Sequence, residues 1–222
     1  MRLLIVSGSQ RAQSQSAKVA KYMSSVATGY SEVSHIELCR FDLPFWDGEP
    51  ESKSGEGNPW AMISYKVRRA DALILITPEW GGMASPLLKN FLLMCNNQDT
   101  AHKPALLVSV VSGISGAYPI AELRMNALKN NKLVALPDHL IIRNVTEVLN
   151  TPPLLASSSL DAELDIECEL GREFESEREI DLRARIDYSL HMLHQYSGAL
   201  VGIRERHEST PYPKQQEYCY GM

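Results

Sequence analysis

Two kinds of segment alternate along the first two thirds of the chain. Five short, mostly apolar runs have the length of strands, and the segments between them carry apolar residues at helical spacing. The expected strands cover residues 3–6, 33–38, 72–76, 105–111 and 133–142, the last interrupted by Pro137. The expected helices cover residues 15–27, 60–70, 85–96, 117–130 and 177–204. Apolar strands separated by helices predict an α/β fold in which helices cover both faces of a parallel sheet.

Two long segments interrupt this alternation. Residues 39–60 are rich in proline and glycine and predict a loop. Residues 161–181 contain ten acidic residues and two arginines, a local charge of −8 that exceeds the net charge of the chain, −5. A solvated surface insertion over about residues 150–176 is the simpler interpretation, and an arm that binds a partner is the alternative. The pattern of residues 160–170 fits both a strand and a helix, so its secondary structure stays open.

The C-terminal part of the chain predicts one more helix and a tail. Ser176 and Glu179 have the spacing of a capping box, which is typical of a helix start. Apolar residues then recur at helical spacing up to Ile203, so this helix is expected to pack on the sheet. The prolines at 211 and 213 indicate a loosely ordered tail over residues 205–222. Without a linker or an internal repeat, residues 1–222 predict a single α/β domain.

Composition narrows the classes of function. The 222 residues have a pI of about 5.7, unlike the basic domains that usually bind nucleic acid. No run approaches 18 apolar residues, so no membrane-spanning helix is expected. The four cysteines are too far apart for a CxxC motif, and the first apolar run is too short for a secretory signal, which predicts a cytoplasmic protein. His191 and His194 are interpreted as surface histidines, and no metal site is predicted, because zinc sites need three or four ligands.

The turn between the first strand and the first helix carries candidate ligand-binding residues. Its sequence is Ser7-Gly8-Ser9-Gln10-Arg11-Ala12-Gln13-Ser14-Gln15-Ser16. A helix N-terminus presents free backbone N–H groups and partial positive charge, which suit an anion. The loop lacks the lysine of a triphosphate loop and the glycines of a dinucleotide fingerprint, so a terminal monophosphate fits better. A helix capped by serine, with an incidental arginine, is the alternative.

Two more loops of small and polar residues follow the third and fourth strands. In the first, Pro78-Glu79-Trp80 leads into Gly81-Gly82, which would let the backbone approach a planar ligand closely. The second is Ser112-Gly113-Ile114-Ser115-Gly116. All three loops are expected at the carboxyl edge of the sheet, where open α/β folds bind ligands. Together they predict a crevice for a flat phosphorylated ligand.

Two motifs in these loops resemble those of the NAD(P)H-dependent FMN reductases of the flavodoxin-like fold. The motif G-S-x-R-x-x-S-x-[NS] matches residues 8–16, and P-E-[YW]-N-G-x-x-P-x-x-L-K-N matches residues 78–90 with proline one place later. The similarity covers about residues 1–145. It implies a doubly wound, five-stranded parallel sheet of strand order 2-1-3-4-5, with FMN as cofactor and NADPH or NADH as co-substrate. It also implies a homodimer or homotetramer, and Leu93, outside the apolar stripe of helix 85–96, suggests an interface there.

The resemblance implies roles for individual residues of the three loops. Those that would hold the FMN phosphate are Ser9, Arg11, Ser14, Gln15 and Ser16. Those that would line the isoalloxazine and ribityl chain are Pro78, Glu79, Trp80, Gly81 and Gly82. Those that would edge the ring are Ser112, Gly113 and Gly116. No catalytic acid or base is implied, because the flavin carries the chemistry.

The implied activity is hydride transfer from the nicotinamide to bound FMN, followed by reduction of a second acceptor such as a flavin, a quinone, an azo compound or a metal oxyanion. The chain departs from the family at three places. Gly81 replaces the usual asparagine, the third loop lacks the family's glycine cluster, and the acidic segment is outside the common pattern. The alternatives are a quinone or azo reductase on the same fold, a flavodoxin-like electron carrier without NAD(P)H activity, and a protein that keeps only the fold.

Overall fold

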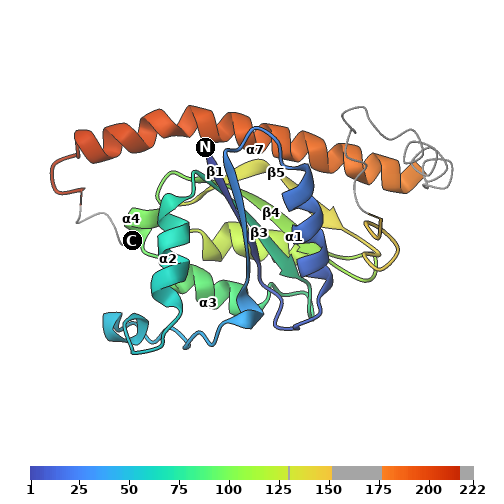
Figure 1. The fold of residues 1–222 in the computed structure, drawn as a ribbon, viewed down its shortest axis with the longest axis horizontal. Helices are drawn as coiled ribbons and strands as arrows, with labels where there is room; N and C mark the ends of the chain where they lie inside the picture. The colour runs from blue at the N-terminus through green and yellow to red at the C-terminus, as the bar shows by residue number, and fades with distance from the viewer. Residues whose placement is uncertain (130, 152–176, 216–222) are drawn as a thin grey trace, which may run out of the picture.

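The computed structural model describes residues 1–129, 131–151 and 177–215. Its centre is a five-stranded sheet of order β2-β1-β3-β4-β5, in which every neighbouring pair is parallel (Figure 1). The strands are β1 (Arg2–Ser7), β2 (Glu32–Glu37), β3 (Ala72–Pro78), β4 (Pro104–Val110) and β5 (Val134–Ile142). The predicted fold class and strand order are therefore confirmed.

The helices also follow the expected order, with differences at their ends. They are α1 (Gln15–Val26), α2 (Trp60–Arg69), α3 (Pro86–Met94), α4 (Asn97–Thr100), α5 (Ala117–Glu122) and α7 (Glu177–Ser209). The expected helix 85–96 ends at Met94, and the short α4 follows it. The expected helix 117–130 is α5 followed by a π-helical turn, η3 (Leu123–Ala127). The expected loop 39–60 contains two 3-10 turns, η1 (Leu38–Arg40) and η2 (Pro50–Lys53).

The side chains of each central strand point alternately into two cores. Leu3 and Ile5 pack with the apolar residues of α1 and α7 on one face. Leu4 and Val6 pack with those of α2 and α3 on the other face. Because helices cover both faces, β1, β3 and β4 need apolar residues at nearly every position, which explains their continuous apolar runs.

Pro137 interrupts the apolar pattern of the last strand without ending it. β5 continues through Pro137 as the edge strand, and its pairing with β4 shifts register between Ala105 and Leu107. Proline has no backbone N–H to donate, so an edge strand with an irregular register is where it is tolerated.

The last helix is longer than the sequence pattern predicts. α7 has 33 residues and crosses the whole width of the molecule in Figure 1. It continues to Ser209, so a loose tail beginning at Glu205 is wrong for these first residues. His194 is also not a simple surface histidine, since its ring contacts Tyr30 edge-on, with centroids 5.2 Å apart, and its Nε2 lies 3.1 Å from the Gly29 carbonyl oxygen.

Some expectations concern residues outside the described part of the chain. These are the structure of the acidic segment from residue 152 to 176, the capping serine at 176, and the tail from residue 216 onwards. Within the described residues, none of the helices combines the length and apolar character required to span a bilayer.

Candidate functional site

A cleft of about 890 Å³ opens at the carboxyl edge of the sheet. The loops after β1, β3 and β4 line it, together with the end of β2 and the loop after β5. The predicted site residues that line it are Ser9, Arg11, Ser14, Gln15, Ser16, Pro78, Glu79, Trp80, Ser112 and Gly113. Gly81, Gly82 and Gly116 do not line it. The structure thus brings the three loops together as predicted.

The first loop directs the amino end of α1 toward the cleft. Ser14 is the N-cap residue of α1, and its Oγ accepts a hydrogen bond of 3.1 Å from the backbone N–H of Ala17. Ser9 Oγ accepts another from the backbone N–H of Arg11, at 3.2 Å. Because the first residues of α1 line the cleft, the partial positive charge of the helix lies there.

A close backbone contact fixes this loop against α3. The backbone N–H of Gly8 donates to the Ile76 carbonyl at 2.8 Å, and Ser85 Oγ donates to the Gly8 carbonyl. A Cβ atom on Gly8 would lie only 2.6 Å from the Cβ of Leu88. Residue 8 must therefore be glycine unless the loop or α3 moves.

The second loop turns tightly at Gly81 and Gly82. Trp80 and Met83 exchange two backbone hydrogen bonds, of 3.2 and 3.1 Å. The two glycines between them have φ angles of +57° and +77°, as a type I′ turn requires. The sequence predicted that these glycines admit a planar ligand, but their conformational freedom is used by the turn. Its effect is to hold Trp80 at the cleft.

Side chains connect the three loops to one another. The guanidinium carbon of Arg11 lies 5.4 Å from the centre of the Trp80 ring, a cation–π contact between the first and second loops. Glu79 accepts a hydrogen bond from Ser115 Oγ, which joins the second loop to the third. Arg143 Nε donates to the carbonyls of Ile114 and Ser115, at 2.6 and 2.9 Å. The third loop is therefore held from two sides.

Gly116 supports the third loop without lining the cleft. It precedes α5 with a φ of +104°, and a Cβ atom there would lie 2.4 Å from Cγ2 of Ile141. Both observations require glycine, one through backbone strain and the other through contact with β5. Its predicted position at the ring edge stays a prediction beside this supporting role.

Three buried oxygens that line the cleft have no hydrogen-bond partner within residues 1–129, 131–151 and 177–215. They are Gln15 Oε1, Ser16 Oγ and Glu79 Oε1. Buried polar atoms are normally paired, because an unpaired one costs about 1–3 kcal/mol in lost hydration. Two of the three belong to the first loop and one to the second, so both loops offer groups suited to a polar ligand.

The cleft also contains charged residues that sequence reasoning missed. They are Lys18, Lys21, His35, Glu37 and Arg40. The helical spacing of Lys18 and Lys21 after the first loop could have placed both near the cleft. The residues of β2 could have been found from the strand order, which sets the end of β2 beside the end of β1.

Four of these residues have structural partners, and Arg40 pairs with Glu37 at 3.0 Å. Lys18 Nζ donates to the carbonyls of Val145 and Val148 and to Asn150 Oδ1, at 2.6, 2.7 and 2.8 Å. Burial lowers the pKa of Lys18, and Glu179 opposes this shift. Burial also lowers the pKa of His35, whose Nε2 lies 2.9 Å from Ser7 Oγ. Lys18 therefore ties the loop after β5 to α1.

Comparison with known proteins assigns the chain to a family. The family model described as NADPH-dependent FMN reductase matches residues 1–147. The chain belongs to this family. The matched range contains β1 to β5 and all three loops of the cleft, whereas α7 lies beyond it. FMN is therefore the cofactor that the cleft has to fit.

The relatives of this FMN reductase family member are similar to it at low sequence identity. An NADPH azoreductase from Bacillus sp. (strain OY1-2) is 27% identical over 142 residues, which are 64% of this chain and 76% of that protein. A quinone reductase from Pseudomonas putida is 28% identical over 118 residues, which are 51% of this chain and 62% of that protein. The chain thus spans less than two thirds of the quinone reductase.

A solved structure supports the fold. An oxidoreductase from Corynebacterium diphtheriae superposes with a TM-score of 0.64 at 14% identity, covering 89% of this chain and 97% of that one. At this identity the likeness concerns the fold alone.

The groups in the cleft fit FMN. FMN carries a phosphate dianion, ribityl hydroxyls and a ring N–H. The Ser16 hydroxyl can donate to a phosphate oxygen, and the oxygens of Gln15 and Glu79 can accept from O–H or N–H groups. The amino end of a helix with a guanidinium beside it is also a common phosphate environment.

Proposed function

We propose that this protein is an FMN-dependent oxidoreductase that takes hydride from NADPH or NADH and reduces a small second acceptor. The observation that carries the proposal is the convergence of three loops on one cleft, with the unpaired oxygens of Gln15, Ser16 and Glu79 inside it. Membership in the NADPH-dependent FMN reductase family supports the same conclusion.

In this proposal Ser9, Arg11, Ser14, Gln15 and Ser16 hold the phosphate of FMN at the amino end of α1. The support is their common position on the cleft and the buried, unpaired hydroxyl of Ser16. A charge-assisted hydrogen bond contributes about 1.5–3 kcal/mol, so a few of them suffice for firm binding.

The second and third loops would line the ring. Pro78, Glu79, Trp80, Ser112 and Gly113 are positioned to do so, since they line the same cleft as the first loop. Gly81, Gly82 and Gly116 would contribute through the backbone, by holding Trp80 in a tight turn and by letting α5 start close to β5.

Bound FMN would supply the hydride and electron transfer. The chain's own residues would bind and orient the reactants. Trp80 presents an aromatic surface at the cleft, where Arg11 restrains it. Glu79 has one carboxylate oxygen on Ser115 and the other unpaired, so it can accept a hydrogen bond from a ring N–H. No side chain is assigned as a catalytic acid or base.

The first test of this function is affinity for FMN and riboflavin, measured by fluorescence quenching. FMN should bind far more tightly than riboflavin, because the first loop is built for a phosphate. Similar dissociation constants for the two would refute the phosphate site.

A second test separates an enzyme from an electron carrier. Anaerobic titration of the FMN-loaded protein with NADPH and with NADH, followed at the flavin absorbance, should bleach the flavin at about one equivalent. A flavin that neither nicotinamide reduces would identify a carrier. The same titrations decide which nicotinamide is preferred.

A third test identifies the second substrate, the electron acceptor. The names of the relatives favour an azo compound or a quinone. Steady-state NADPH oxidation with a benzoquinone, an azo dye and free FMN, each varied separately, would rank the acceptors by kcat/KM. A quinone or azo dye should exceed free FMN.

We further propose a homodimer or homotetramer with α3 near its interface. Leu93 on α3 is 55% exposed, and Met83, Tyr118 and Met125 are exposed on neighbouring elements. Sedimentation of the wild type and of Leu93→Asp would test this. A monomeric wild type removes the proposal, and an oligomer unaffected by Leu93→Asp moves the interface elsewhere.

The chain is also proposed to form one domain and to work in the cytoplasm. Ile186 and Leu193 of α7 pack in the same core as the strands, which supports a single cooperative unit. Calorimetry should show one unfolding transition. The free thiols Cys39 and Cys95 suit a reducing compartment, and cell fractionation would check the location.

A further inference from the structure

A second cavity, of about 580 Å³, lies at the opposite edge of the sheet. Its lining includes Asp71, Lys103 and Lys132, which precede β3, β4 and β5, and Arg204 and His207 near the end of α7. None of its lining residues lines the cleft. Ligands of open α/β folds usually bind at the carboxyl edge, so a cavity at the amino edge requires its own explanation.

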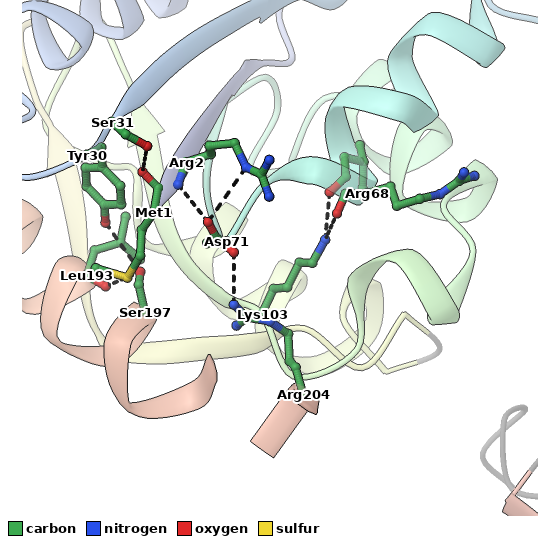
Figure 2. Close-up of polar contacts among 11 residues, drawn as sticks. Met1, Arg2, Tyr30, Ser31, Arg68, Asp71, Lys103, Leu193, Ser197 and Arg204 are labelled. Atoms are coloured by element: carbon green, nitrogen blue, oxygen red, sulfur yellow. Dashed lines mark hydrogen bonds and ion pairs between the residues drawn. The ribbon is translucent and has the colours of Figure 1, made fainter. Parts of the chain in front are cut away.

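Lys103 is a buried cation in the wall of this cavity. Its residue is 6% exposed, and its Nζ donates to the carbonyls of Val67 and Arg68, both at 2.8 Å (Figure 2). These carbonyls are at the C-terminal end of α2, where a cation is favourable. They are neutral, however, and Lys103 forms no ion pair with any residue that the structure describes. Burial lowers the pKa of Lys103 to about 8, with Arg204 adding to the shift and Asp99 and Asp71 opposing it.

Arg204 shares its carboxylate partner with a second arginine. Asp71 accepts a hydrogen bond from the backbone N–H of Arg2 at 2.7 Å, and one of its oxygens lies 3.2 Å from Nη2 of Arg204 (Figure 2). The guanidinium of Arg2 is 3.9 Å from the same carboxylate. Nη1 of Arg204 is buried and has no hydrogen-bond partner within the described part of the chain. Arg204 is therefore only partly satisfied.

The charges around the cavity do not balance. Among the residues that the structure describes, the guanidinium of Arg68 pairs with Asp99 at 2.9 Å. Four cations line the cavity, Arg68, Lys103, Lys132 and Arg204, and three carboxylates among the described residues line it with them, Asp71, Asp99 and Glu208. One positive charge therefore remains in excess. The least matched cations are Lys103, which has no carboxylate partner among the described residues, and Arg204, which shares Asp71 with Arg2. Buried charge is unfavourable without a counter-ion.

We propose that this cavity binds a phosphate dianion, either inorganic or the terminal group of a small organic molecule, next to Lys103 and Arg204. A dianion offers one charge to Lys103 and one to Arg204, the two cations that lack a full counter-charge. A guanidinium offers paired N–H donors to an oxyanion, and an ammonium with two carbonyl partners keeps a third N–H. The cavity is much larger than a phosphate, so an attached organic group can be accommodated.

The test is calorimetric titration of the FMN-loaded protein with inorganic phosphate near neutral pH, at constant ionic strength set with chloride. FMN loading keeps free phosphate out of the first loop. Wild-type protein should bind about one phosphate. Arg204→Gln should raise the dissociation constant about tenfold or more, the loss expected for one charge-assisted hydrogen bond. Arg206→Gln is the matched control, because it makes the same charge change on an exposed part of the same helix outside the cavity, and it should leave the constant unchanged.

A second measurement covers the case in which Arg204→Gln is destabilised. Phosphate should raise the thermal midpoint of wild type more than chloride at equal ionic strength, and Lys103→Met should abolish this difference. The proposal is overturned if wild type shows no saturable binding up to about 50 mM phosphate, far weaker than a specific site. Equal weakening by Arg204→Gln and Arg206→Gln would also overturn it, since this would indicate general charge attraction.

Two further ligands test which chemical groups the cavity binds. Acetate should bind at least about tenfold more weakly than phosphate, because its single negative charge cannot serve both Lys103 and Arg204. Equal binding of acetate and phosphate would contradict the dianion. Phenyl phosphate that binds more tightly than inorganic phosphate would assign the site to an organic phosphate, and equal or weaker binding would assign it to the inorganic ion.

Discussion

The cleft and the cavity lie at opposite edges of one sheet and are built in different ways. The cleft takes many of its lining residues from two short runs of sequence, residues 9–16 and 78–80, and offers hydroxyls, amides and the amino end of a helix. The cavity gathers side chains such as those of Asp71, Lys103 and Arg204, which are distant in sequence. A site of the first kind leaves a motif in the sequence, whereas a site of the second kind exists only after folding.

The two regions also differ in the charge of their unpaired groups. In the cleft, Gln15 and Ser16 offer neutral oxygens, and Glu79 is the one acid among the unpaired oxygens described there. In the cavity the incompletely matched groups are cations. Protonation should therefore affect the cavity more than the cleft, whereas the shape of the loops should matter more at the cleft.

The largest expected effect concerns Lys103 and pH. Its pKa of about 8 in the folded protein lies below the ordinary value of 10.5, so the unfolded state binds more protons between these values. Stability should therefore rise with pH across this window, by on the order of 3 kcal/mol in total, and the penalty is fully present below pH 8. Urea unfolding at several values between pH 7 and 10 should show this rise in wild type and lose it in Lys103→Met. Equal pH slopes in both proteins would mean that Lys103 is not buried as a cation.

The next effect tests whether the two regions bind independently. Arg11→Ala should weaken FMN binding by about 1.5–3 kcal/mol, because it removes a charge-assisted hydrogen bond to the phosphate. It should leave phosphate binding at the cavity unchanged, and Arg204→Gln should leave FMN binding unchanged. Arg69→Ala, on an exposed part of α2, is the charge control. A weakening of both ligands by either variant would contradict separate sites.

A smaller effect tests how closely the cleft loops are packed. Gly8→Ala should destabilise the protein by about 1–3 kcal/mol, because the new methyl group overlaps Cβ of Leu88. Gly55→Ala is the control, since no atom lies within 4 Å of a Cβ built there. Urea unfolding measures both. If Gly8→Ala is as stable as Gly55→Ala, the contact between the first loop and α3 is looser than described.

The smallest effect concerns Trp80. Trp80→Ala removes the contact with Arg11, which contributes about 0.5–1 kcal/mol at an exposed site. The flavin absorbance and the rate of acceptor reduction should change, while the fold remains intact by circular dichroism. Trp80→Phe keeps an aromatic face and should restore most of the difference. If neither the flavin spectrum nor FMN affinity changes, Trp80 is only a packing residue.

The sequence predicted the sheet and the three loops because their determinants are local. The apolar runs of β1, β3 and β4 reflect burial on both faces, and the serine caps at Ser14 and Ser85 mark the starts of α1 and α3. The structural reasons for glycine at 81 and 116 were not predicted, because φ angles and contacts across the sheet are not visible in a sequence.

The amino-edge cavity could not be predicted for a different reason. Lys103 and Arg204 are ordinary surface residues by type, and neither has neighbours in sequence that form a motif. Their importance follows from burial and from the sharing of Asp71, which only the packed structure reveals. The continuation of α7 from residue 205 to Ser209, which adds His207 and Glu208 to the lining of the cavity, was also not expected from the pattern.

The tight turn at Gly81 and Gly82 has a consequence for how such reductases diverge. A type I′ turn accepts asparagine as well as glycine at its first central position, because both tolerate a positive φ. Exchange of the family's usual asparagine for Gly81 therefore changes one side chain beside Trp80 and leaves the path of the backbone intact. Selection can therefore change the side chain at this position while the ring of Trp80 keeps its place.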